Sequence, residues 1–215
     1  KGGSQKIVTA MQALIEERGG KLETSADVDR ILVSGDRATG VRTTDGRTFG
    51  ARKAVVCNVT PPQLYGRLLP DAPEPVRERA RRYAFGRGCM QIHMALDGPP
   101  PWQDPELARV PLLHLSQSLE DVATAVTEAN NGLLPRAVPV AMGQPVAVDP
   151  SRAPEGKSIL WLQIQAMPSR LRGDAAGQIE TPADGRWNEA VREAMADRIQ
   201  AQVEAVMPGM GQRII

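Results

Sequence analysis

The stretch GVRTTDGRTFGARKAVVCNVTPP, residues 40–62, constrains the fold of this chain more than any other segment. Its Asp45–Gly46 pair separates two strand-like segments, and this dipeptide is typical of a type I′ turn, in which both central residues take positive φ. The run KAVVCN that follows, residues 53–58, is apolar at its centre and predicts a short strand buried on both faces. The chain is therefore expected to pass from an antiparallel hairpin directly into the interior of a sheet.

Apolar residues recur at helical spacing in several other segments. The first segment carries one apolar stripe from Ile7 to Ile15, with Ser4 as its N-cap and Gly19–Gly20 as its stop signal. Another begins with Ser118 and Asp121, a pair that resembles a capping box. Helices are predicted over residues 5–18, 74–84, 118–131 and 186–207.

Strand patterns lie between the predicted helices. Residues 89–97 alternate Met90, Ile92, Met94 and Leu96 with polar or small residues, which predicts a half-buried strand. A strand is also predicted near residues 110–116, and a strongly buried one over 158–167. The proline-rich residues 135–154 are expected to form an ordered loop with short strands at its edges. The fold class is therefore α+β, in two parts that divide near Thr60–Gln63.

Composition limits the kinds of partner. The chain has 26 Lys and Arg against 25 Asp and Glu, a net charge of +1, so charge gives no case for nucleic acid as a partner. No run of about 18 apolar residues predicts a membrane span. One predicted helix carries a basic run, which indicates a solvated face, although contact with an anionic membrane surface stays open. The run consists of Arg77, Arg79, Arg81 and Arg82.

The cysteines and histidines do not form a metal-binding pattern. Cys57 and Cys89 are expected to be buried free thiols in strands, not a disulfide. His93 and His114 have no ligand neighbour at metal spacing, so no metal site is predicted. His93 falls on the polar face of its strand, where it is either a hydrogen-bonded surface residue or a general base.

Glycine patterns do not supply a complete phosphate site. The sequence has no G-x-G-x-x-G, and Gly86 and Gly88 lead into a strand instead of opening a helix. Gly2 and Gly3 precede a helix, where they serve either as ligand-facing backbone or as a flexible entry. The sequence also contains no nucleophile elbow and no P-loop, so no self-contained active site is predicted.

The order of these motifs nevertheless resembles the phytoene desaturase-like flavoproteins of the amine oxidase-like FAD superfamily. Residues 2–70 match that family in a Gly-Gly before a helix, a second Gly-Gly, the GVRTTDG hairpin and the run AVVCNVTPPQLYGRLL. The resemblance continues through CMQIHMALDGPPPW, SLEDVATAVTEANNG, SILWLQIQAMP and WNEAVREAMADRIQAQVEAVMPG, which is nearly the whole chain. It is strongest for the branch that includes the animal pyridine nucleotide-disulfide oxidoreductase domain proteins. Ser158 stands where relatives often carry His.

The resemblance implies how the chain is organised. In this family one glycine-rich flavin motif precedes the matched region and another follows it, so the chain is expected to be a central fragment. Residues 1–61 would be part of an α/β FAD-binding domain, and residues 62–215 a substrate-binding domain with a mixed sheet. The parent protein would be an FAD-dependent dehydrogenase that takes a hydride from an apolar or lipid-like substrate. The isolated chain is expected to be inactive and to hold FAD weakly.

The resemblance also implies roles for particular residues. Val28 would contact the adenine end of FAD through its main chain. The segment Asn58, Val59 and Thr60 would leave the FAD domain near the cofactor. Gly2 and Gly3 would face the region between flavin and substrate. The substrate cavity would draw on strands 89–96 and 158–166, with His93 as its polar group and a speculative catalytic residue.

Two other functions stay open at this point. One alternative is that the chain is part of an amine oxidase-like flavoenzyme that acts on a polar amine. The other is that it is a non-catalytic binding module of the same fold. An aromatic cage would favour the first, and the aromatic content of 3% argues against it. A cytoplasmic location, with peripheral membrane contact as an alternative, and a homodimer formed through exposed apolar surface are further expectations.

Overall fold

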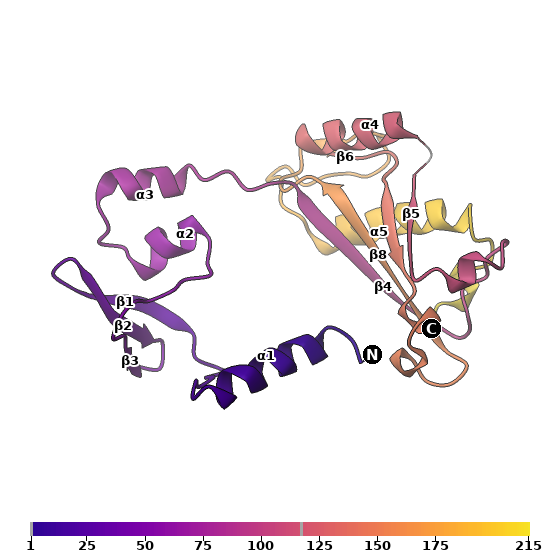
Figure 1. Cartoon of the computed structure of the whole chain (residues 1–215). Coiled ribbons are helices and arrows are strands. Elements are labelled where there is room, and N and C mark those ends of the chain that lie inside the picture. Colours follow the sequence, from indigo (N-terminus) through magenta and orange to yellow (C-terminus); the bar gives the residue numbers. More distant parts are fainter. Residues whose placement is uncertain (1, 117) are drawn as a thin grey trace. The chain divides into compact units, whose positions relative to one another are not determined.

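The computed structural model describes residues 2–116 and 118–215, which form two compact units (Figure 1). The sheet unit consists of Gly86–Ile215 and the residues before Thr9, and the hairpin unit consists of Thr9–Phe85. The boundary expected near Thr60–Gln63 falls inside the hairpin unit. The division into an FAD-binding part, 1–61, and a substrate-binding part, 62–215, stays a prediction.

The N-terminal half contains the predicted helix and hairpin. Helix α1 covers Gln5–Glu17. A three-stranded antiparallel sheet follows, in the order β1–β2–β3. Its strands are β1 (Val28–Ser34), β2 (Arg37–Thr43) and β3 (Thr48–Gly50).

The turn between β2 and β3 differs from the predicted type I′ geometry. Gly46 has a φ of 87°, whereas Asp45 is not among the described residues with positive φ. Gly46 N–H donates to Thr43 O at 2.9 Å, and Thr43 N–H donates to Arg47 O at 2.9 Å, which makes a three-residue loop with the left-handed glycine last. The Asp45 carboxylate accepts hydrogen bonds from Thr43 Oγ1 and from Arg47 Nε, and these bonds lower the pKa of Asp45 to about 2. The longer loop thus gives the carboxylate partners on both sides of the turn.

The strand predicted for residues 53–58 does not form. The segment is irregular, and Val56 is 92% exposed. Among residues 2–116 and 118–215 no strand pairs with it, so its backbone lacks the ladder that defines a strand. The prediction of buried thiols is also wrong: both cysteines are free, but Cys57 is half-buried outside any strand and Cys89 is exposed.

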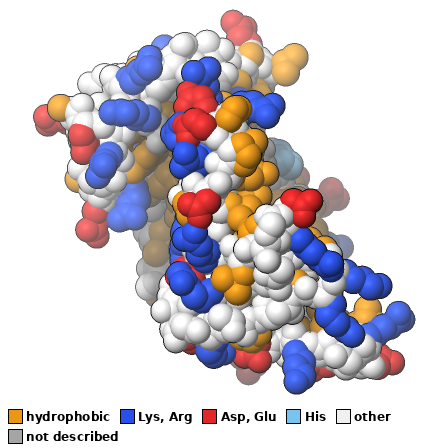
Figure 2. All heavy atoms as spheres, turned by 90° about the vertical axis from the view of Figure 1, so that its left-hand side faces the viewer, with side chains coloured by type: hydrophobic (Ala, Val, Ile, Leu, Met, Phe, Trp, Pro, Cys, Tyr) orange, Lys and Arg blue, Asp and Glu red, His pale blue; other side chains and the backbone are white. Residues whose placement is uncertain are grey.

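The hairpin unit ends with short helices. Helix α2 (Pro61–Gln63) runs into one π-helical turn at Leu64–Leu68, and helix α3 covers Glu74–Arg81. Most arginines of α3 and its C-cap form ion pairs along the helix: Arg81 and the C-cap residue Arg82 each approach Glu78 at 2.8 Å, and Arg77 pairs with Glu74. Figure 2 shows the same mixture, with blue and red side chains interspersed on the face that it draws. The basic run therefore has the character of a solvated helix face.

The sheet unit is built on four antiparallel strands in the order β4–β8–β7–β5. These strands are β4 (Gly88–Leu96), β8 (Ser158–Met167), β7 (Val140–Gly143) and β5 (Leu112–Leu115). The helices are α4 (Leu119–Asn130) and α5 (Glu189–Glu204). Two short strands, β6 (Leu133–Leu134) and β9 (Gly173–Asp174), pair in parallel. Helices segregated from antiparallel sheets confirm the α+β class.

Helix α5 covers one face of this sheet (Figure 1). Its apolar residues recur every three or four positions, and Val191, Met195, Ile199 and Val203 are all buried. They join a core with the inward residues of the strands, which include Met94, Leu96, Val140, Met142, Leu160, Leu162 and Ile164. Burial of each such side chain stabilises the fold by about 1.5–3 kcal/mol. The alternate residues of the strands point away from α5, so their side chains lie on the opposite face of the sheet.

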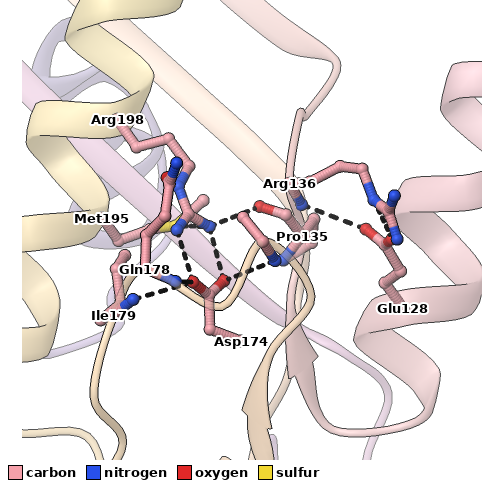
Figure 3. A network of polar contacts seen from close by, with 9 residues as sticks. Glu128, Pro135, Arg136, Asp174, Gln178, Ile179, Met195 and Arg198 are labelled. Atoms are coloured by element: carbon pink, nitrogen blue, oxygen red, sulfur yellow. Dashed lines mark hydrogen bonds and ion pairs between the residues drawn. The ribbon is translucent and has the colours of Figure 1, made fainter.

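A buried ion pair fastens the loop before α5 (Figure 3). The Asp174 side chain is 1% exposed, and both of its oxygens accept from the Arg198 guanidinium at 2.7 Å. The backbone N–H groups of Ala176, Gln178 and Ile179 also donate to this carboxylate. Burial raises the pKa of Asp174, but these donors outweigh it and hold the pKa well below its usual range. The carboxylate is therefore fully charged and fully partnered in the fold.

The same arginine reaches the segment after α4. Arg198 Nη1 donates to Pro135 O at 3.0 Å. The next residue, Arg136, donates from its backbone N–H and from Nε to the buried carboxylate of Glu128, at 3.1 and 2.7 Å. Helices α4 and α5 are thus linked through polar contacts that no sequence pattern predicts.

Candidate functional site

The face of the four-stranded sheet opposite α5, here the open face, carries two rows of side chains in register across all four strands. Residues paired in an antiparallel ladder point to the same side of the sheet. The first row consists of Gln91, Gln163, Ala141 and His114, and the second consists of His93, Trp161, Gly143 and Leu112. None of these residues is buried except Gly143.

The open face changes character along the strands. Cys89 and the first row lie toward the start of β4 and carry amide, thiol and imidazole groups. Ala95 and Ile159 pair at the other end and are apolar. A ligand lying along the strands would therefore meet hydrogen-bonding groups at one end and hydrocarbon at the other.

Trp161 is held flat against the backbone of β7. A Cβ atom added to Gly143 would lie 2.0 Å from Trp161 Cε2 and 2.3 Å from Nε1, closer than any real contact. The indole therefore occupies the space above Gly143, which only a residue without a side chain leaves open. Since the ring lies over β7, the space above β4 beside His93 is not filled by it.

His93, the speculative catalytic residue, lies on the open face of β4 and is exposed. It faces Trp161 across the ladder. Among the described residues the imidazole has no hydrogen-bonding or ion-pair partner, so a carboxylate that would orient it as a general base is not provided by this part of the chain. Its substrate-side role stays a prediction.

Helix α4 borders the open face at the end of β8. Ala125 and Ala129 of the helix pack against Ala166 of the strand. Ser118 caps the helix by accepting from Asp121 N–H at 3.1 Å, as its sequence predicted. Small residues on both sides let the helix approach closely, so the polar end of the face is bounded by a helix.

Gly2 and Gly3 lie against the turn that follows β7. Both have positive φ, of 89° and 77°, which only glycine adopts freely. Gly2 N–H donates to Asp149 Oδ2 at 2.8 Å, and this bond lowers the pKa of Asp149. A Cβ on Gly3 would lie 2.1 Å from Arg152 Nη1. The glycine pair thus contacts a carboxylate and a guanidinium of the sheet unit, and its predicted place facing the region between flavin and substrate stays a prediction.

The residues predicted to contact FAD lie in the hairpin unit. Val28 is the first residue of β1 and pairs with Thr43. Asn58 and Val59 are exposed on the irregular chain after β3. Thr60 caps α2, and its N–H donates to Gln63 Oε1 at 3.3 Å. Nothing in this unit tests the assignment of these residues to an FAD site.

The described residues do not form the phosphate-binding part of an FAD site. Such a site needs a parallel strand, a glycine-rich turn and the N-terminus of a helix in sequence. Within residues 2–116 and 118–215, parallel pairing is confined to β6 and β9, two residues each. The same residues hold no group of three His, Cys, Asp or Glu side chains that could bind a metal ion. No helix in this part of the chain is long and apolar enough to cross a membrane.

Comparison with known proteins agrees with the resemblance seen in the motifs. The family model of flavin-containing amine oxidoreductases matches residues 1–205. A zeta-carotene-forming phytoene desaturase of Myxococcus xanthus is 30% identical over 165 residues, which cover 76% of this chain and 30% of that protein. The neurosporene-forming phytoene desaturase of Cereibacter sphaeroides is 27% identical over 99% of this chain and 38% of its own length.

More distant relatives give the same picture. The mouse pyridine nucleotide-disulfide oxidoreductase domain-containing protein 2 is 25% identical over all of this chain and 37% of its own length. The crystal structure of an oxidoreductase from Methanosarcina mazei superposes with a TM-score of 0.60 at 17% identity, over 98% of this chain and 40% of that one. The chain thus spans well under half the length of these proteins.

Proposed function

Because this chain belongs to the family of flavin-containing amine oxidoreductases, we propose that it forms the substrate-facing part of an FAD-dependent oxidoreductase. In such an enzyme the flavin accepts a hydride from the substrate, here an apolar or lipid-like molecule. The match over residues 1–205 carries the proposal. The similarity to phytoene desaturases supports the apolar substrate class.

The open face supports the substrate-facing role. An antiparallel sheet whose second face is not covered by α5 offers a broad surface, and the Trp161 ring adds an aromatic area to it above β7. The residues of this chain would bind and orient the substrate there and exclude water from it. His93 would be the polar group next to the reacting part of the substrate. Val28, Asn58, Val59 and Thr60 are proposed to lie on the cofactor side, and Gly2 and Gly3 on the substrate side, facing the region between flavin and substrate.

An amine substrate is the second candidate, since the family takes its name from amine oxidoreductases. A protonated amine needs a carboxylate or an aromatic cage. The two rows of the open face contain one aromatic residue, Trp161, and no Asp or Glu. This composition favours the apolar substrate. A non-catalytic binding module remains the third candidate.

The test uses the full-length product of the gene that encodes this chain. The purified protein is mixed without oxygen with phytoene in detergent or with benzylamine, and the absorbance of oxidised flavin is followed. Loss of that absorbance with phytoene alone supports the proposal. Loss with benzylamine alone would favour the amine candidate, and a protein that never contains flavin would favour the binding module.

The 215 residues alone give a companion measurement. Because the phosphate cradle is lacking in the described residues, the purified chain is expected to retain much less than one flavin per chain. A stoichiometric flavin content would contradict this expectation and would place the cradle in residues that the sequence patterns do not identify.

A further inference from the structure

The first residues of β4 lie beside the end of β8 (Figure 1), and a cavity is lined by residues of both. Its volume is about 440 Å³, within the range of small-molecule sites. Strand β4 is the edge of the sheet, so the outer side of its backbone pairs with no strand at this end among the described residues. The cavity thus combines side chains with accessible main-chain groups.

The cavity is lined by apolar side chains, by the polar side chains of Cys89, Gln91 and Ser169, and by one cation. Met90, Met167 and Trp187 supply hydrocarbon and an indole, and Arg192 of α5 supplies the only charged group. Trp187 is fixed in place because its Nε1–H donates to Pro168 O at 2.9 Å. Such a lining suits a ligand that is mostly apolar and carries one negative charge.

Arg192 is available to a ligand. Among residues 2–116 and 118–215 its guanidinium takes part in no ion pair and no hydrogen bond, whereas Arg198, six residues further along α5, is bound by Asp174 and Pro135. A guanidinium binds a carboxylate with two parallel hydrogen bonds. The cavity therefore contains a free cation beside an apolar wall.

The open face points to the same end of the sheet. Cys89 and Gln91 line the cavity and also begin the polar end of that face. Gln163 Nε2 lies 3.6 Å from Cys89 Sγ, so the amide of the neighbouring strand also turns toward this end. The free arginine, Arg192, and the polar end of the open face thus both border this cavity.

We propose that this cavity binds the carboxylate end of a mainly apolar molecule, with Arg192 holding the carboxylate and Met90, Met167 and Trp187 contacting the hydrocarbon. The site is distinct from the flavin chemistry proposed above, and its test is a binding measurement that does not require flavin. If the flavin reduction assay described above failed, the proposal of a carboxylate site would be unaffected.

Calorimetric titration of the 215-residue chain with octanoate, octan-1-ol and inorganic phosphate tests the site. Octanoate is expected to bind at least about tenfold more tightly than octan-1-ol, because one charge-assisted pair is worth about a factor of ten or more. Phosphate, which lacks the hydrocarbon, is expected to bind at least as weakly as the alcohol. Equal affinity for octanoate and octan-1-ol, or tighter binding of phosphate, would overturn the proposal.

Variants distinguish binding in the cavity from nonspecific binding to positive charges on the surface. Arg192→Gln is expected to lower octanoate affinity to that of octan-1-ol, while Arg109→Gln, a matched change outside the cavity, leaves it unchanged. Ser169→Trp fills the cavity from its exposed rim and is expected to weaken both octanoate and the alcohol. Circular dichroism checks that each variant is folded. Equal loss in Arg192→Gln and Arg109→Gln, or unchanged binding in Ser169→Trp, would place the ligand elsewhere.

Discussion

The sheet unit and the hairpin unit bury very different amounts of apolar surface within themselves. In the sheet unit, α5 and four strands enclose a continuous core whose central members, such as Leu162 and Ile199, are 0% exposed. In the described part of the hairpin unit, the buried apolar residues are Ile31, Leu68 and Ala80. Two regions with similarly strong apolar patterns in sequence therefore reach very different degrees of burial.

This difference in burial shows that an apolar pattern in the sequence does not by itself predict that the side chains are buried. Helix α1 has its stripe as expected, but Met11 is 62% exposed and Leu14 is 52% exposed. A stripe tells which side of a helix will be buried if a partner covers it. It does not supply the partner. The sheet unit covers the stripe of α5 with its own strands, whereas among the described residues nothing buries the stripe of α1.

The largest expected effect is at the ion pair of the sheet unit. Asp174→Asn leaves Arg198 buried without its counter-charge, which is expected to lower the free energy of unfolding by about 3–5 kcal/mol. Chemical denaturation followed by tryptophan fluorescence measures it. Asp184→Asn removes an exposed partner of Arg186 at 4.0 Å and is expected to cost no more than about 1 kcal/mol. Equal losses in the free energy of unfolding for Asp174→Asn and Asp184→Asn would show that burial does not strengthen the contribution of the ion pair to stability.

The same carboxylate predicts a pH dependence. The pKa of Asp174 in the folded state lies below its unfolded value of about 3.9, so its contribution to stability is full above that pH. It is lost as the pH falls through about 4 toward the folded-state pKa. Asp174→Asn is expected to flatten this part of the stability curve. An unchanged slope in the variant would assign acid sensitivity to other groups.

A matched pair of core and surface changes compares the units directly. Ile199→Ala in α5 is expected to cost about 2–5 kcal/mol because it opens a cavity in a packed core. Met11→Ala in α1, where the side chain is 62% exposed, is expected to change stability by no more than about 0.5 kcal/mol. A large effect at Met11 would mean that α1 is covered in solution.

A smaller effect is expected on the open face. Gly143→Ala forces Trp161 off the backbone of β7 and is expected to cost about 1–3 kcal/mol. Near-ultraviolet circular dichroism reports the changed indole environment. Gly86→Ala, where an added Cβ meets nothing within 4 Å, is the control. If Trp161→Ala does not rescue the Gly143→Ala variant, the contact is not the cause.

The smallest effect concerns association. The exposed apolar residues of the hairpin unit are expected to make the chain self-associate weakly as concentration rises. Sedimentation velocity over a range of concentrations measures this. Met11→Glu in α1 is expected to lower the associated fraction, whereas Thr9→Glu on the same helix serves as a control for added charge. A strictly monomeric chain at high concentration would contradict the predicted homodimer.

The sequence predicted the elements whose partners lie within the sheet unit. Strands β4 and β8 and helix α5 were read from alternation and from the four-residue repeat, because each buries its apolar side against the others. Strand β7 lies inside the proline-rich stretch and was not resolved from it, since four residues give little periodicity. The strand predicted at residues 53–58 does not form, because a strand requires a neighbouring strand to pair with as well as an apolar sequence.

The site was predicted in part. His93 was placed on the polar face of its strand from alternation alone, and the structure has it there. Trp161, Gln163 and Gly143 were missed, because which residues meet across a sheet depends on the register of β7 and β8 and not on either strand alone. Arg192 was missed for a similar reason: the cavity joins two strands, a loop and a helix that are far apart in sequence.

Hydrogen exchange resolved to peptides tests most directly that residues 86–215 form a stable framework that presents the open face. Amides of β8 and α5 are expected to exchange only through global unfolding. Those of α1 and of residues 53–60 are expected to exchange through local opening, orders of magnitude faster. Equal protection in the two units would contradict the account, because it would mean that the hairpin unit has a core of its own strength.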